Sequence, residues 1–128
     1  MKKFIIYDIR KQKIKEGKNL SSINLELIKK AMDERKSISA YYKNYFRKLS
    51  PYELGTKKGK YRCLFYQYGG KSSSGVINSR SKHNWRCMEL NKLKKLQILD
   101  EPLFKPNILT HKKPSKCIDK VIKRIMIN

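Results

Sequence analysis

The residues best equipped for chemistry in this chain are cations and aromatics that share one stretch without acids. No Asp or Glu lies between Glu53 and Glu89. The stretch holds eight cations: Lys57, Lys58, Lys60, Arg62, Lys71, Arg80, Lys82 and Arg86. It also holds five aromatics: Tyr61, Phe65, Tyr66, Tyr68 and Trp85. Cations neutralise phosphates and aromatic faces stack on unpaired bases, so this composition predicts a surface that binds a polyanion such as nucleic acid.

Four cations in or beside this stretch are the best candidates for a cluster that faces phosphate: Arg47, Arg62, Arg86 and Lys92. Arg62 and Arg86 fall in two segments with strand character, where alternation of side chains can bring both to one face. Guanidinium groups suit phosphate because they present two N–H donors at once, whereas the abundant lysines supply a background field. The alternative interpretation is that these residues are ordinary solvated strand positions.

The aromatic run 61–68 divides into two faces if it forms a strand. One face, which we expect to be core, carries Tyr61, Cys63 and Phe65. The other face, which we expect to bind the ligand, carries Arg62, Leu64, Tyr66 and Tyr68. Tyr66 and Tyr68 are then the stacking platforms for bases, while Trp85 belongs to the core or its rim.

The segment Gly69–Gly75 is rich in glycine and serine. It does not place Gly-Lys-Ser/Thr ahead of a helix, which excludes a phosphate-binding P-loop. Two interpretations stay open. The segment is either a plain hairpin connection or a mobile basic loop, with Lys71 and then Arg80, that becomes ordered on a partner.

Groups suited to catalysis or metal binding are sparse. The chain has only two histidines, and no Ser or Cys sits in a nucleophile elbow. His83 and Cys87 have a His-x-x-x-Cys spacing that Cys63 or His111 can complete, but no Cys-x-x-Cys exists. A metal nuclease needs clustered carboxylates, whereas the carboxylates of this chain are scattered along the sequence. We therefore expect no enzyme, no metal and no cofactor.

The bulk composition describes one small basic domain. The 128 residues suffice for a single domain, and 39% apolar content excludes a disordered basic tail. The net charge of +22 favours nucleic acid or a nucleoprotein as partner over mere compositional bias.

Three widely spaced cysteines, Cys63, Cys87 and Cys117, predict no disulfide framework and a cytoplasmic protein. The apolar run Phe4–Tyr7 is too short for a signal peptide or membrane span.

The elements that must position these residues follow from periodicity. Helical spacing predicts a helix from Ile23 to Arg35, capped by Ser21 or Ser22. Alternation then predicts short strands at 38–42, 46–49, 61–68, 85–90 and 93–99. Pro51 should end the second of these or place it at an edge, and the tail should form a strand or a short helix. The fold class is thus α+β, mainly β: an N-terminal helix packed on a small antiparallel barrel or curled sheet of about five strands.

The order of these parts resembles the WYL domain. The likeness runs from Ile23 to Phe104, through ISAYYKNYFRKLSPYELG, GKYRCLFYQYGG and NWRCMELNKLKKLQILDEPLF. The strand Tyr and the Arg-x-x-x-Pro element of the family fall on Tyr42, Arg47 and Pro51, and Pro-x-x-Leu-Gly falls on Pro51, Leu54 and Gly55. The Trp-Tyr-Leu positions fall on Tyr61, Arg62 and Cys63. The late Arg-x-Phe-x-Leu-Asp-Arg-Ile element and the closing Phe fall on Arg86, Met88, Leu90, Asn91, Lys92, Leu93 and Phe104.

This resemblance implies a fold and a function. It implies an Sm-like barrel over 23–104, a basic arm over 1–22 and an extension over 105–128. WYL domains occur in bacterial regulators and in phage-defence or CRISPR-associated proteins. There they bind single-stranded nucleic acid or nucleotide-like ligands. The chain is then a non-enzymatic module that binds single-stranded RNA or DNA and modulates a larger nucleoprotein or defence complex.

Two further interpretations stay open beside this one. The chain is alternatively a protein-interaction factor, an inhibitor or accessory subunit that docks on a nucleic-acid enzyme such as an RNA-guided nuclease. A small-molecule sensor follows from the family resemblance alone. Exposed sheet edges also make a homodimer conceivable.

Overall fold

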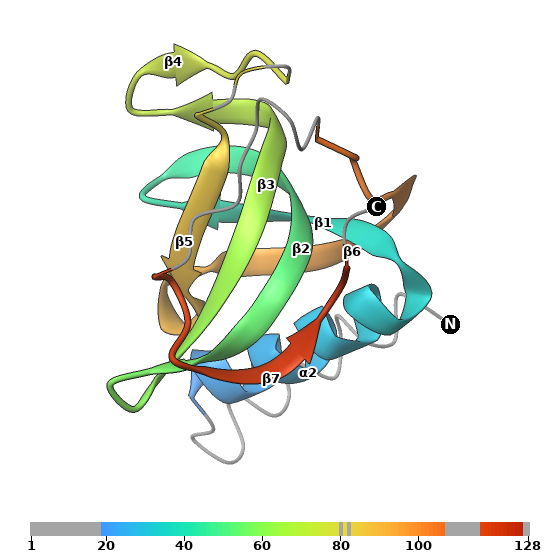
Figure 1. Cartoon of the computed structure of the whole chain (residues 1–128). Helices are drawn as coiled ribbons and strands as arrows, with labels where there is room; N and C mark the ends of the chain where they lie inside the picture. The colour runs from blue at the N-terminus through green and yellow to red at the C-terminus, as the bar shows by residue number, and fades with distance from the viewer. Residues whose placement is uncertain (1–18, 80, 82, 107–115, 127–128) are drawn as a thin grey trace.

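The computed structural model of the chain describes residues 19–79, 81, 83–106 and 116–126 (Figure 1). In these residues one α-helix packs on a seven-strand antiparallel sheet, so the predicted class, α+β and mainly β, is confirmed. The apolar run Phe4–Tyr7 and the rest of the arm before Asn19 lie outside the described residues. A search of the described part for a helix of sufficient length and apolarity to cross a membrane finds none.

Helix α2 (Leu20–Glu34) matches the predicted helix but begins three residues earlier. Asn19, rather than Ser21 or Ser22, is the N-cap, and its side-chain oxygen accepts the backbone N–H of Ser22 at 3.0 Å. The helix ends at Arg35, whose left-handed conformation (φ 55°) lets its N–H bond back to the last turn. The residues at helical spacing form the buried face: Ile23, Leu27, Ile28, Ala31 and Met32.

The seven strands all pair antiparallel. They are β1 (Lys36–Tyr42), β2 (Tyr45–Lys57), β3 (Lys60–Ser72), β4 (Gly75–Val76), β5 (Trp85–Glu89), β6 (Lys94–Pro102) and β7 (Lys120–Arg124). The main path runs β4-β3-β2-β1-β6, while β5 pairs with β3 and β7 pairs with β2. A 3-10 turn, η1 (Leu90–Lys92), separates β5 from β6.

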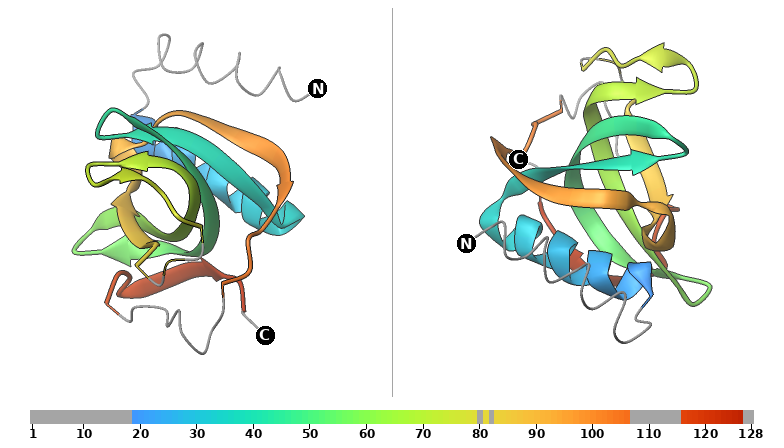
Figure 2. Two further views of the ribbon diagram at one scale, coloured as in Figure 1. Left: turned by 90° about the horizontal axis from the view of Figure 1, so that it is seen from above. Right: turned by 180° about the vertical axis from the view of Figure 1, so that it is seen from behind.

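The sheet curls strongly but does not close. Figure 2 shows the strands curving around a common interior, with α2 lying across one end. Within the described residues no ladder joins β5 to β6, so a closed barrel is not formed, and the strand number is seven rather than about five. The added strands are β4, which begins at the last residue of the predicted loop, and β7, which confirms the tail strand.

Strand β2 passes straight through Pro51, where the sequence predicted an end or an edge. The pairing of β1 with β2 stops at Leu49, and that of β7 begins at Glu53. Pro51 thus lies where one side of β2 changes partner, so its missing N–H breaks no ladder on that side. The two strands β2 and β3 are consequently 13 residues each, longer than the predicted runs.

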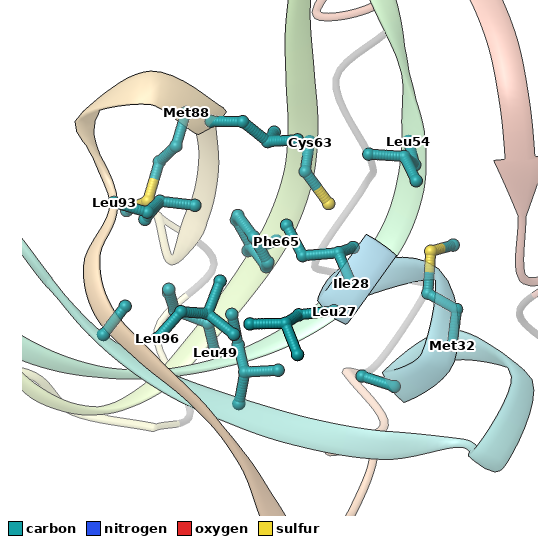
Figure 3. Close-up of a cluster of buried hydrophobic side chains, with 14 of the residues drawn as sticks. Leu27, Ile28, Met32, Leu49, Leu54, Cys63, Phe65, Met88, Leu93 and Leu96 are labelled. Atoms are coloured by element: carbon teal, nitrogen blue, oxygen red, sulfur yellow. The ribbon is translucent and has the colours of Figure 1, made fainter. Parts of the chain in front are cut away.

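The core lies on the inner face of the sheet, which we define as the face toward α2. Figure 3 shows α2 contributing Leu27, Ile28 and Met32 to a cluster of side chains from β2, β3, β5 and β6. Cys63 and Phe65 point into this cluster, as predicted for their face of the strand. Their burial, together with that of the helix, supplies the main apolar contribution to stability.

A buried amide holds α2 to the turn between β5 and β6. Asn24 is 2% exposed and donates from Nδ2 to the carbonyls of Leu90 and Leu93, both at 2.8 Å. Those carbonyls belong to η1 and the residue after it, where the backbone leaves the ladder. Asn24 therefore satisfies acceptors that the sheet does not.

We expect Asn24→Ala to destabilise the fold by about 1–3 kcal/mol, because it leaves a buried carbonyl without a donor. Urea denaturation should show a lower midpoint with an unchanged m-value. Asn91→Ala, an exposed change in the same turn, is the matched control and should shift stability by no more than roughly 0.5 kcal/mol. Equal effects of the two substitutions would contradict this role for Asn24.

Candidate anion-binding site

A shallow hollow of about 340 Å³ opens at the end of the curled sheet away from α2. The β1–β2 turn, the β3–β4 hairpin and the start of β5 meet there, at the upper left of Figure 1. We call it the arginine hollow. Its lining residues are Tyr42, Lys43, Arg47, Ser72, Ser73, Trp85, Arg86, Cys87 and Met88.

Arg47 lies on the inner face, two residues before the core residue Leu49. Its side chain is buried to 5% exposure, and its guanidinium donates to the Tyr42 carbonyl from Nε (3.2 Å) and from a terminal nitrogen (3.1 Å). It also donates to Oε1 of Gln67 at 3.2 Å. The rings of Tyr42 and Tyr45 lie 5.2 and 5.8 Å from the guanidinium carbon. These partners are all neutral, so they fix the orientation of the cation without cancelling its charge.

Arg86 lies on the same inner face, because its register partner is Phe65 and it precedes Met88 by two residues. Burial lowers the pKa of Arg47, and the positive charge of nearby Arg86 lowers it further. The Nε of Arg86 is buried and has no hydrogen-bond partner within the described part of the chain. Two like charges thus line the same hollow, an arrangement that an anion would stabilise.

Arg62 does not join this pair, so the predicted sharing of a face by Arg62 and Arg86 is wrong. Arg62 is the register partner of Glu89, three residues beyond Arg86, and an odd offset places the two arginines on opposite faces. Arg62 forms an ion pair with Glu89 at 3.5 Å, and Lys92 approaches the same carboxylate at 4.0 Å. Two of the four predicted phosphate ligands therefore already have an acidic partner.

Tyr66 is fully buried, which corrects its prediction as a stacking platform. Its ring stacks on Phe104 (5.3 Å between centroids) and meets the edge of Trp85 (5.2 Å). Its hydroxyl donates to the carbonyls of Ser79 and Ser81. The outer face of β3 is therefore a second buried face, because the segment after β6 and the chain before β5 cover it.

Tyr68 is half-buried and also stacks on Phe104, at 5.9 Å. Its hydroxyl donates to Glu101 at 2.6 Å, and Lys48 binds the same carboxylate at 3.0 Å. Burial, followed by the hydrogen bond to Glu101, raises the pKa of Tyr68. Trp85 packs against the core, as predicted.

The other predicted site residues are placed as follows. Lys71 is exposed at the end of β3, where it pairs with Val76 of β4. The segment Gly69–Gly75 therefore belongs to a hairpin, which confirms its interpretation as a plain hairpin connection. Arg80 lies outside the described residues, as does His111. Among the described residues no group of three His, Cys, Asp or Glu side chains is placed to hold a metal ion.

The sequence predicted no disulfide framework, whereas the structure contains one disulfide. Cys87 and Cys117 are bonded across 30 residues of sequence, with their Cα atoms 5.6 Å apart. The fold returns the chain before β7 across the outer face of β3 and β5, where Cys117 and Ile118 pack on Leu64. Spacing along the chain did not indicate this, because it depends on the long-range pairing of β7 with β2. Cys63 is the free, buried thiol.

Sequence reasoning missed the aromatic residues at the tip of the β1–β2 hairpin. Lys43 and Asn44 form a two-residue turn, both with positive φ (52° and 68°). Tyr42 and Tyr45 flank it on the inner face beside Arg47, while Tyr41 and Phe46 pair on the outer face. The signal was present in the sequence: two aromatics on each side of Lys-Asn, at strand alternation.

Comparisons with known proteins assign no family to the chain. No family model, curated protein or solved structure matches it. The resemblance to WYL domains therefore stays a prediction, and the functional interpretation depends on the geometry of the arginine hollow.

The backbone beside the hollow leaves no room for a side chain at Gly70. Gly70 is the register partner of Arg47 and has a φ of 83°. A Cβ there would collide with the Phe46 carbonyl and lie 2.8 Å from the Arg47 Cα. Gly59, in the β2–β3 turn, has a similar φ of 78° but nothing within 4 Å of its Cβ position.

We expect Gly70→Ala to cost at least about 2 kcal/mol more stability than Gly59→Ala. Both substitutions introduce the same left-handed strain, of about 1 kcal/mol, and only Gly70→Ala adds a steric clash. Chemical denaturation of the two variants measures the difference. If both variants lose the same stability, β2 and β3 are not as close at Arg47 as described.

Proposed function

We propose that this chain is a non-enzymatic nucleic-acid-binding module, and that the arginine hollow holds a phosphate of single-stranded RNA or DNA. The observation that carries this proposal is the pair Arg47 and Arg86. Arg47 is 5% exposed and is held only by neutral oxygens, while the charge of Arg86 acts against it. A buried cation without a counter-charge is costly, and a bound phosphate would supply that charge.

The chemistry of the hollow fits a phosphate group. Forked guanidinium donors match phosphate oxygens, and the two lining arginines, Arg47 and Arg86, carry such donors. Lys43 and the hydroxyls of Ser72 and Ser73 line the same opening and can contact further oxygens. A volume of about 340 Å³ is at the small end of the range for ligand sites, enough for a phosphate and part of a nucleoside.

The rest of the chain supplies a field that favours the same ligand. The formal net charge is +22, and the stretch between Glu53 and Glu89 contains no acid. Counterion release from a nucleic-acid backbone would give much of the affinity, with the hollow fixing the register of the strand. We propose that such a module modulates a larger nucleoprotein complex, as the resemblance to WYL domains implies.

We further infer that the curled sheet is an Sm-type barrel left open between β5 and β6. The order of the elements supports this inference: a helix, three strands, β5, η1 and a last strand that returns to β1. It is the order on which the WYL resemblance was based. A cytoplasmic location belongs to the same proposal, and there the Cys87–Cys117 pair would be reduced.

A second candidate is a protein-interaction factor that docks on a nucleic-acid enzyme. Three exposed apolar residues near the C-terminal end of the described chain favour it: Val121, Ile122 and Met126. Side chains of this kind are enriched in protein interfaces more than in phosphate contacts. On this interpretation, free nucleic acid would bind only weakly and without dependence on the hollow.

We expect Arg86→Gln to weaken binding of a single-stranded oligonucleotide about tenfold, because it removes one charged donor from phosphate. The slope of log K against log salt should fall by about 0.7 in magnitude. Fluorescence anisotropy over a salt series measures both quantities.

Arg62→Gln is the matched control, since Arg62 faces the opposite side and is paired with Glu89. It should change affinity and slope less than Arg86→Gln does. Equal losses in the two variants would show that only the general field matters and would reject the hollow as the phosphate site. Absence of salt-dependent binding in the unmodified protein would favour the protein-interaction candidate.

A further inference from the structure

Two aromatic rings lie exposed on the outer face of the β1–β2 hairpin. Tyr41 and Phe46 are register partners, and their rings meet edge to face with centroids 5.5 Å apart and planes at 62°. They are 41% and 42% exposed, whereas Tyr66 is fully buried. Tyr41 and Phe46 thus present ring surface to solvent, as a stacking platform requires.

Two lysines of β6 lie beside this pair. Lys95 places its Nζ 5.9 Å from the centre of the Tyr41 ring, and Lys94 is the register partner of Tyr41 on β6. Lys95 has a φ of 53°, a conformation that residues with a Cβ rarely adopt, at an irregularity in the β1–β6 ladder. Within the described residues, Lys94 and Lys95 form no ion pair with a carboxylate. These charges are therefore available to phosphates.

We propose that Tyr41 and Phe46 form a base-stacking platform for single-stranded nucleic acid. The inference rests on the proposed function and adds to it the site that selects single strands, because only unpaired bases expose their faces to aromatic side chains. The platform and the arginine hollow lie on the two faces of one hairpin, whose tip is the two-residue turn Lys43-Asn44. A strand that bends around this tip would contact both sites.

The charges around the platform favour nucleic acid over a second copy of the chain. In a two-fold symmetric contact the same patch meets itself, so Lys94 and Lys95 of both copies would be brought into one interface. Like charges at such a contact repel, and each phosphate of a strand would instead offset one of them.

The test compares a ring-deleting variant with a ring-keeping one. Tyr41→Thr with Phe46→Thr removes both rings and retains strand propensity. Tyr41→Phe with Phe46→Tyr keeps both rings. Val76→Thr removes another exposed apolar side chain, on β4, and is the surface control. Each protein is titrated with polythymidine, with an abasic oligonucleotide of the same length and with a duplex.

We expect the ring-deleting variant to bind polythymidine between about fivefold and a hundredfold more weakly. Its affinity for the abasic oligonucleotide and for the duplex should not change, nor should its salt slope, because the phosphate contacts are retained. The ring-keeping variant and the surface control should bind polythymidine as the unmodified protein does.

Other outcomes overturn the proposal in distinguishable ways. If the unmodified protein binds polythymidine and the ring-deleting variant binds it equally well, the platform is wrong and the proposed function stands. If the unmodified protein binds none of the three probes, both are wrong. If sedimentation shows a dimer that the ring-deleting variant loses, the platform is a contact between copies instead.

A measurement on the unmodified protein avoids dependence on variant folding. Photo-crosslinking to an oligonucleotide that carries 5-iodouracil links the base to an aromatic side chain stacked on it. Mass spectrometry should then locate the crosslink at Tyr41 or Phe46. Crosslinks confined to other aromatic residues would overturn the platform.

Discussion

The pairing of β2 with β3 is the constraint on which the rest of the structure depends. These two strands pair from Lys57 and Lys60 at the turn to Arg47 and Gly70 at the far end. Each also supports two further elements, since β2 carries β1 and β7 while β3 carries β5 and β4. Two register shifts in the β2–β3 ladder accompany the curl. The position of every candidate binding residue follows from this long, bent hairpin.

The inner face of that hairpin changes character along its length. Leu54 and Leu49 of β2 lie in the core beneath α2, and Arg47 is the next residue of the same face. The inner face of β2 thus changes from apolar side chains to a buried cation between Leu49 and Arg47. Neutral oxygens and two tyrosine rings orient the Arg47 side chain, so the hollow is pre-organised before any ligand binds.

The β1–β2 hairpin gives the proposed interface two faces. Its inner side contributes Tyr42 and Lys43 to the hollow, and its outer side exposes Tyr41 and Phe46. A short turn with positive φ at both central residues keeps the strands twisted together, which fixes the separation of the two sites. Charge attraction to the backbone and stacking on bases are different interactions, and this hairpin places one on each side.

The sequence by itself determined the helix, the five short strands, the mainly β class and the basic, acid-poor character, because these depend on local periodicity and composition. It also identified Arg47 and Arg86 as ligand candidates. Only the tertiary structure decided that Arg86 shares a face with Arg47 and that Arg62 does not, because register between distant strands sets that relation. Burial of Tyr66 and the joining of Cys87 to Cys117 were decided in the same way. Both depend on segments that return over the outer face of the sheet, and alternation within one strand carries no information about what covers it.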